Sequence, residues 1–263
     1  MSKQTELLQQ QLLGKNEIES LHLLASYFPD EVVFSTSFGM EDQVITHLIR
    51  NNHIPIKIFT LDTGRMFPET YATWDKTDMS YQTTTIPYYP DAASVESYVK
   101  AHGINAFYNS PELRKECRHI RKVEPLKRAL AGNKVWITGL RAEQSPNREQ
   151  MPQVEWDEGN QIIKFHPILH WKITEVLDFL RTNGVPYNPL HDKGFISIGC
   201  QPCTRAVKEG EDFRAGRWWW EDKSKKRVRI AFHKVNQQTS VQKNDEKVYF
   251  TITTSPFGGL SIF

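Results

Sequence analysis

The feature that most constrains the fold of this chain is a repeated order of short apolar segment, polar turn and helical segment. Residues 31–35 are apolar and lead into a helical pattern at 41–50. Residues 56–61 (IKIFTL) form the second apolar segment, and a helix is expected to begin near Phe67. Alternating strands and helices are typical of a parallel sheet that is covered by helices on both faces. We therefore expect an α/β fold with a twisted parallel sheet.

The same order continues along the chain. We expect one or two helices at 6–27, strands at 83–87, 135–140 and 162–168, and helices at 94–102 and 174–183. Thr174 is the expected N-cap of the last helix, and Gly184 the expected stop. After Trp220 the pattern is lost, because a charge run is followed by residues with no steady period.

Three of the strands end in polar residues. The first runs into Ser35-Thr36-Ser37-Phe38-Gly39, where backbone N–H groups and a helix N-terminus would face a phosphate. The GK[ST] ending of a Walker loop is missing, and such turns also occur in α/β proteins that bind no ligand. The second strand ends in Asp62-Thr63-Gly64, and residues 141–148, which include two arginines, follow the strand at 135–140. Open α/β sheets place ligands at this end of their strands.

Residues 193–220 contain a CxxC pair, three arginines and three consecutive tryptophans. Cys200 and Cys203 bring two sulfur ligands to one point, which suits an iron–sulfur cluster or zinc. A redox-active CxxC or two unrelated buried thiols are the alternatives. Arg214 and Arg217 are three residues apart, so on a helix they would share a face and bind phosphate or sulfate through paired donors.

A third cysteine, Cys117, lies within little more than one helical turn of Arg121 and Lys122. Nearby cations lower the pKa of a thiol and stabilise anionic sulfur. Spacing alone favours the simpler interpretation, a solvated basic helix face with an incidental cysteine. Similarly, His191 is either a ligand or a hydrogen-bonded structural histidine, and the second is favoured.

Composition limits the class of protein. The chain has 263 residues, enough for one large domain, and its net charge of +2 gives no strong attraction to nucleic acid or to a membrane surface. It contains no apolar run of membrane-spanning length, and its first residues lack the apolar core of a signal peptide. Three cysteines, an odd number, argue against a secreted disulfide scaffold. We expect a cytoplasmic protein.

Several segments occur in family order between residues 32 and 226: STSFGMEDQV, LDTGRMFPETY, CRHIRKVEPL, TGLRAEQSPNR, VPYNPLHDKGF, GCQPCTRAV and GEDFRAGRWWWE. Together they resemble the adenylyl-sulfate and phosphoadenylyl-sulfate reductases of assimilatory sulfate reduction. The resemblance implies an adenine nucleotide α-hydrolase-like (PP-loop) fold. It also implies cleavage of the S–O bond of an activated sulfate to sulfite plus AMP or adenosine bisphosphate, with electrons from thioredoxin or glutaredoxin.

The resemblance also implies roles for individual residues. Ser35, Ser37 and Gly39 would line the nucleotide loop, Leu61 and Asp62 would face the adenosine, and Lys122, Arg141, Arg214 and Arg217 would neutralise phosphate and sulfate. Family members that use adenylyl sulfate hold a 4Fe–4S cluster with a Cys-Cys pair and a CxxC. In this chain Cys117, Cys200 and Cys203 match three of those ligands, but Arg118 stands at the fourth. We therefore expect the adenylyl-sulfate type, with a cluster that is labile, reduced to three irons or not formed.

The end of the chain departs from the family. The family tail reads Lys-Lys-Glu-Cys-Gly-Leu/Ile-His, and its cysteine is the nucleophile; here Val228 holds that position and Ala231 that of the histidine. For one permitted choice of codons over 225–233, removal of one A from the opening run restores Lys-Lys-Glu-Cys-Gly-Leu-His-Phe. We infer a one-base insertion, with residues 1–226 as the reductase domain and 227–263 as an aberrant, disordered tail. The alternative is a genuinely diverged tail.

The sequence is also compatible with functions other than adenylyl-sulfate reduction. The chain is expected to bind nucleotide and to turn over little. The first alternative is a phosphoadenylyl-sulfate reductase. The second is a non-catalytic nucleotide-binding protein that binds a partner through its tail. An ATP-using pyrophosphatase is disfavoured because the SGGxDS-type loop is absent. Whether the chain forms a homo-oligomer does not follow from its sequence.

Overall fold

The computed structural model describes residues 3–144, 148 and 150–221. Its centre is a six-stranded sheet with the order β3-β2-β1-β4-β6-β5, in which β5 alone is antiparallel to its neighbour. The strands are β1 (Val32–Thr36), β2 (Lys57–Leu61), β3 (Ile86–Tyr88), β4 (Val135–Ile137), β5 (Val154–Asp157) and β6 (Ile162–Phe165). The expected α/β class and parallel sheet are confirmed. The antiparallel edge strand β5 was not expected.

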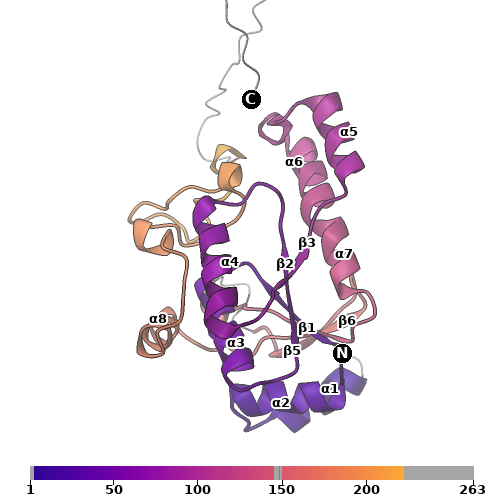
Figure 1. Cartoon of the computed structure of the whole chain (residues 1–263), viewed down its shortest axis with the longest axis vertical. Helices are drawn as coiled ribbons and strands as arrows, with labels where there is room; N and C mark the ends of the chain where they lie inside the picture. Colours follow the sequence, from indigo (N-terminus) through magenta and orange to yellow (C-terminus); the bar gives the residue numbers. More distant parts are fainter. Residues whose placement is uncertain (1–2, 145–147, 149, 222–263) are drawn as a thin grey trace, which may run out of the picture. The chain divides into compact units, whose positions relative to one another are not determined.

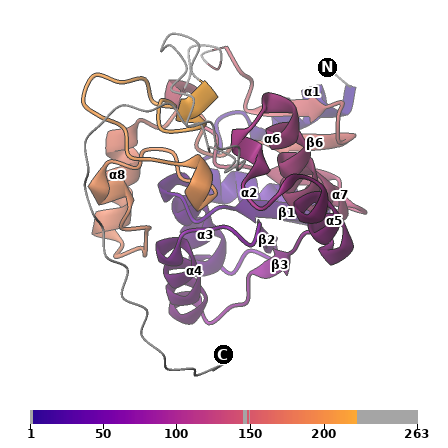
Figure 2. The same cartoon turned by 90° about the horizontal axis from the view of Figure 1, so that it is seen from above.

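Helices cover both faces of this sheet. They are α1 (Lys3–Leu12), α2 (Glu17–Tyr27), α3 (Met40–Asn51), α4 (Pro68–Tyr81), α5 (Ala92–His102), α6 (Pro111–Arg118), α7 (Glu124–Leu130) and α8 (Ile173–Thr182). Figure 1 and Figure 2 show α3 and α4 on one side of the sheet and α5, α6 and α7 on the other. None of the described helices is long and apolar enough to cross a membrane.

The alternating side chains of β1 serve two separate cores. Val32 and Phe34 pack into a large cluster with residues of α2, α3 and α8. Val33 points the other way and packs with Ala129 and Leu130 of α7. Successive side chains of a strand point to opposite faces, so a strand that is apolar throughout requires cover on both faces. Burial on both faces fixes the position of β1 and therefore the position of the polar turn that follows it.

Two local expectations were wrong. Helix α8 begins at Ile173, and Glu175 Oε2 accepts a hydrogen bond from Lys172 N at 2.6 Å, so Thr174 lies inside the helix and is not its N-cap. Arg214 and Arg217 do not share a helix face, because the chain around them forms turns. Arg217 forms an antiparallel bridge with Thr204, which requires an extended backbone.

Helices α6 and α7 are joined without a break by a π-helical turn, His119–Val123, in which Glu124 N donates to His119 O. Pro125 comes next and has no N–H for the carbonyl four residues earlier, so one bond of the α-helical ladder is missing there. Such wider turns are frequent at functional sites. Arg121 and Lys122 lie in this turn; Arg121 Nη1 donates to Thr63 O, just after β2, at 2.6 Å, and Lys122 lines the cavity described below.

Candidate functional site

A cavity of about 410 Å³ lies at the carboxyl ends of β1, β2 and β4. Strand order reverses between β1 and β4, because β2 and β3 extend to one side of β1 and β4 lies on the other. Ligands of open α/β sheets bind at such a reversal. The expected site residues that line the cavity are Ser35, Ser37, Gly39, Leu61, Lys122 and Arg214. Residues of the CxxC segment, including Gly199 and Cys200, form part of its wall.

The loop after β1 is held by a half-buried carboxylate. Asp42 Oδ2 accepts hydrogen bonds from Ser37 N at 2.6 Å and from Ser37 Oγ at 2.7 Å. Burial raises the pKa of Asp42 to about 6, although the hydrogen bonds from Ser37 act in the opposite direction. The position of Ser37 in the cavity wall therefore depends on Asp42, which the sequence reasoning did not single out.

Phe38 gives this loop its shape. Its φ is +59°, a left-handed conformation that costs free energy for a residue with a side chain. The conformation is stabilised because the Phe38 ring is buried and stacks on Trp74 with 5.5 Å between ring centroids. Thr36 Oγ1 accepts from Phe38 N at 3.0 Å. With Phe38 turned inward, Ser37 and Gly39 line the cavity.

Four cations line the cavity from separate parts of the chain: Lys122, Arg148, Lys164 and Arg214. Lys164 forms ion pairs with Glu155 and Asp157. None of the other three lies within ion-pair distance of a carboxylate among the described residues. Cations without a protein counter-charge form a receptor for an anionic ligand. The sequence shows Arg148 only as one of the two arginines after β4, and no local pattern distinguishes it from Arg141.

Three expected substrate contacts lie outside the cavity lining. Arg141 has a side chain only 2% exposed and forms ion pairs with Glu41, at 2.9 Å, and with Glu143. Asp62 accepts hydrogen bonds from Gly64 N and from the Tyr71 hydroxyl, both at 2.8 Å. The charge of Arg141 is thus matched by two carboxylates, and its expected contact with a substrate anion stays a prediction.

Arg217, the third of these residues, lies against the CxxC turn. A Cβ at Gly199 would occupy the space of the Arg217 guanidinium, so this approach depends on glycine. The Nε of Arg217 is buried without a hydrogen-bond partner among the described residues. Burial lowers the pKa of Arg217, whereas Cys200 and Cys203 act to raise it. Arg217 is therefore a neighbour of the sulfur atoms and not of the cavity.

The cysteines do not match a cluster held by four thiolates. Cys200 Sγ lies 3.2 Å from Thr63 Oγ1. Burial raises the pKa of Cys203 to about 11. Burial also raises the pKa of Cys117, and this effect is larger than the opposite effect of the nearby cation Arg121, which was expected to lower the pKa of that thiol. Arg118, at the position of the fourth ligand, is exposed and carries no thiol. Within the described part of the chain, no three side chains of metal-binding type are grouped to hold an ion. The residues present therefore do not fit a 4Fe–4S cluster with four cysteine ligands.

His191 also lines the cavity. Both of its ring nitrogens are buried and have no partner at hydrogen-bond geometry among the described residues, although the Phe195 main chain lies nearby. The favoured interpretation, a hydrogen-bonded structural histidine, is thus not supported. Burial lowers the pKa of His191, which keeps the ring neutral at pH 7.

Residues 31–206 match the family model of the phosphoadenosine phosphosulfate reductase domain. The chain belongs to the phosphoadenosine phosphosulfate reductase family. The segment that matches the family includes the loop after β1, the π-helical turn and the CxxC pair, but Arg214 and Arg217 lie beyond its end.

Similar members of the family include two proteins named adenosine 5'-phosphosulfate reductase. The one from Allochromatium vinosum is 50% identical over 193 residues, covering 73% of this chain and 75% of the relative. The one from Burkholderia cepacia is 48% identical over 197 residues, covering 75% and 79%. The solved phosphoadenylyl-sulfate reductase of Candida auris, in a phosphate complex, is 30% identical with a TM-score of 0.67 and covers 79% of this chain and 98% of its own.

Proposed function

We propose that this chain is a reductase domain that binds adenylyl sulfate in the cavity at the carboxyl ends of β1, β2 and β4. The observation that carries this proposal is a group of three cations, Lys122, Arg148 and Arg214, that line the cavity together with Ser37 and form no ion pair with a carboxylate of the described residues. Adenylyl sulfate presents one phosphate and one sulfate, and guanidinium groups bind both through paired N–H donors. Relatives at 44–50% identity carry the matching name.

In the proposed reaction, a cysteine thiolate attacks the sulfur atom of the substrate. The S–O bond breaks, AMP leaves with the bonding electron pair, and the thiol carries a sulfonate group. A dithiol of the thioredoxin or glutaredoxin class then supplies two electrons, releases sulfite and becomes a disulfide. The cations of this chain would bind the phosphosulfate and stabilise the negative charge that develops on the leaving phosphate.

The cysteine that performs the attack is the part that this chain lacks at its expected position. Val228 stands there, and Val228, Ala231 and the proposed 227–263 tail lie outside the described residues. A valine side chain has no lone pair with which to attack sulfur. We therefore propose that the chain as written binds adenylyl sulfate and releases little or no sulfite.

Phosphoadenylyl sulfate is the second candidate substrate, since the Candida auris relative is named for it. The intact CxxC of Cys200 and Cys203 and the higher identity to the adenosine 5'-phosphosulfate reductases favour adenylyl sulfate. A cytoplasmic location fits this function and is proposed with it.

Binding calorimetry tests the proposal. Adenylyl sulfate is expected to bind at least about 10-fold more tightly than adenosine, because a hydrogen bond to a charged group contributes about 1.5–3 kcal/mol. It is also expected to bind more tightly than phosphoadenylyl sulfate. Equal affinities for adenosine and adenylyl sulfate would contradict the proposed substrate, and tighter binding of phosphoadenylyl sulfate would favour the second candidate.

The cluster has its own test. We propose that three thiols hold at most a labile or three-iron cluster, so Arg118→Cys is expected to raise the iron and acid-labile sulfide content of anaerobically purified protein toward four of each per chain. Arg118→Ser is the matched control, because it removes the cation without adding a thiolate. A full complement of iron in the unmodified chain would show that Arg118 is not at a ligand position.

A further inference from the structure

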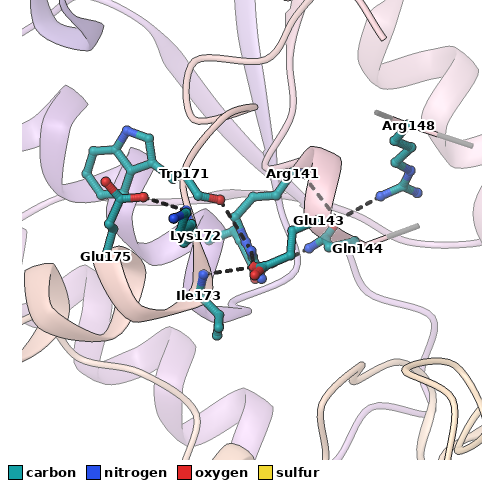
Figure 3. Close-up of polar contacts among 9 residues, drawn as sticks. Arg141, Glu143, Gln144, Arg148, Trp171, Lys172, Ile173 and Glu175 are labelled. Carbon is teal, nitrogen blue, oxygen red and sulfur yellow. Dashed lines mark hydrogen bonds and ion pairs between the residues drawn. The ribbon is translucent and has the colours of Figure 1, made fainter. Parts of the chain in front are cut away.

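The two arginines that follow β4 have different surroundings. Arg141 is buried and ion-paired with Glu41 and Glu143, and Glu143 Oε2 also accepts from Ile173 N at 2.9 Å. Arg148 instead lines the cavity and has no carboxylate partner among the described residues. Figure 3 shows Gln144 between the two arginines. The ion pair of Arg141 and Glu41 is therefore connected to Arg148 through Gln144.

Gln144 is held in a single orientation by its partners. Its Nε2 donates to Glu41 Oε1 at 3.0 Å, the same oxygen that accepts from Arg141 Nε at 2.9 Å. A carboxylate accepts hydrogen bonds and donates none, so the amide nitrogen of Gln144 must face Glu41. The amide oxygen then faces the other way, and it accepts from Arg148 Nη1 at 2.7 Å. The ion pair of Arg141 and Glu41 thus determines where Arg148 is held.

Arg148 faces another cation. Arg214 lines the same cavity and disfavours the charged form of Arg148, whose pKa is lowered first by burial and then by Arg214. The guanidinium groups of Arg148 and Arg214 form no ion pair with a carboxylate of the described residues, so they repel each other until an anion lies between them. Only one donor of Arg148 is used by Gln144, and a guanidinium has five.

We propose that Arg148 and Arg214 together bind the phosphosulfate group of the substrate, and that Gln144 is a positioning residue that holds Arg148 toward it. Lys122 approaches the cavity from the π-helical turn and completes the anion site. Arg141 is then the buried support of this arrangement. The inference rests on the proposed function, because it assigns contacts to the same ligand.

Calorimetric titration with adenylyl sulfate and with adenosine tests the contact. Arg148→Ala is expected to weaken adenylyl sulfate binding by about 10- to 100-fold and to leave adenosine binding within about twofold, since only the anion is contacted. The adenylyl sulfate affinity of Arg148→Lys is expected to lie between those of the unmodified chain and of Arg148→Ala, because lysine keeps the charge and loses the paired donors. Arg128→Ala, which removes an exposed arginine paired with Glu124 outside the cavity, is the control and should change neither affinity.

Gln144→Ala tests the positioning role. Alone it should weaken adenylyl sulfate binding, and in the Arg148→Ala background it should have no further effect, since the two act as a unit. If the unmodified chain binds adenylyl sulfate and adenosine equally, the proposed function fails. If the unmodified chain prefers adenylyl sulfate over adenosine and Arg148→Ala keeps that preference, Arg148 does not contact the phosphosulfate group. If the effects of Gln144→Ala and Arg148→Ala on adenylyl sulfate affinity are additive, Gln144 does not act by positioning Arg148.

Discussion

Rebuilding the tail with Arg227→Glu, Val228→Cys, Arg229→Gly, Ile230→Leu and Ala231→His is expected to raise sulfite release from adenylyl sulfate by about 10³-fold or more. Loss of a covalent nucleophile typically removes most of the rate of an enzyme that depends on it, because the remaining groups bind the substrate without attacking it. The cavity and its cations are present in the described residues. The expected gain therefore concerns turnover, and the affinity for adenylyl sulfate should change much less.

Sulfite release with thioredoxin and its reductase as electron source measures this effect. Without any reductant, the rebuilt chain should release one equivalent of AMP and gain the mass of one sulfonate group on the introduced thiol. The same tail with Val228→Ser is the matched control, since a hydroxyl of similar size is a far weaker nucleophile at neutral pH. Equal sulfite release by the cysteine and serine forms would show that the introduced thiol does not carry the reaction.

The gene separates the two explanations of this tail. A run of A bases at the codons of Lys225 and Lys226, from which removal of one base restores the cysteine in frame, is expected if the tail is a frameshift product. If no single-base change in this run restores the cysteine, the tail has genuinely diverged from that of the family. In that case a non-catalytic nucleotide-binding protein becomes the better account, and the unmodified chain should bind adenylyl sulfate without ever releasing sulfite.

Most of the sheet could be predicted from the sequence because its strands are buried on both faces. Continuous apolar runs such as 56–61 are strong signals, and their polar ends indicated the correct edge of the sheet. Strand β5 was missed because Val154–Asp157 contains two acidic residues and a partly exposed tryptophan, as an edge strand allows. The Glu-Gly-Asn turn before β6 was the available signal for this hairpin.

The site was only partly predictable, because its decisive contacts join residues far apart in sequence. Arg141 and Arg148 look equivalent after β4, and what separates them is Glu41, about a hundred positions earlier, which pairs with Arg141 and orients Gln144. Likewise, nothing in the hydroxyl-rich loop shows that Ser37 depends on the carboxylate of Asp42. Residue type indicated which groups could bind an anion, and tertiary contacts decided which of them are free to do so.

The turn that follows β4 has a second decisive position, Gly139. Gly139→Ala is expected to weaken adenylyl sulfate binding by about 100-fold and to lower the free energy of unfolding by about 1–3 kcal/mol. An added Cβ would overlap Asp42 Oδ1 and would lie 3.2 Å from Glu41 Cβ and 3.3 Å from Asp42 N. The Asp42 carboxylate is held by two hydrogen bonds from Ser37, and Asp42 N belongs to the main chain of α3. The methyl group must therefore displace the start of α3 and the loop that lines the cavity.

A double-mutant cycle with Asp42→Ala identifies the cause of this loss. Asp42→Ala removes the atom that the methyl group would meet most closely, so Gly139→Ala should cost markedly less stability in that background than in the unmodified chain. Denaturant unfolding gives the four free energies, and calorimetry shows whether adenylyl sulfate affinity follows them. Equal costs in both backgrounds would mean that Gly139 matters through its backbone conformation. Its φ is not positive, unlike that of Gly64 at +67°, so the close approach of α3 is the reason that a side chain is excluded at position 139.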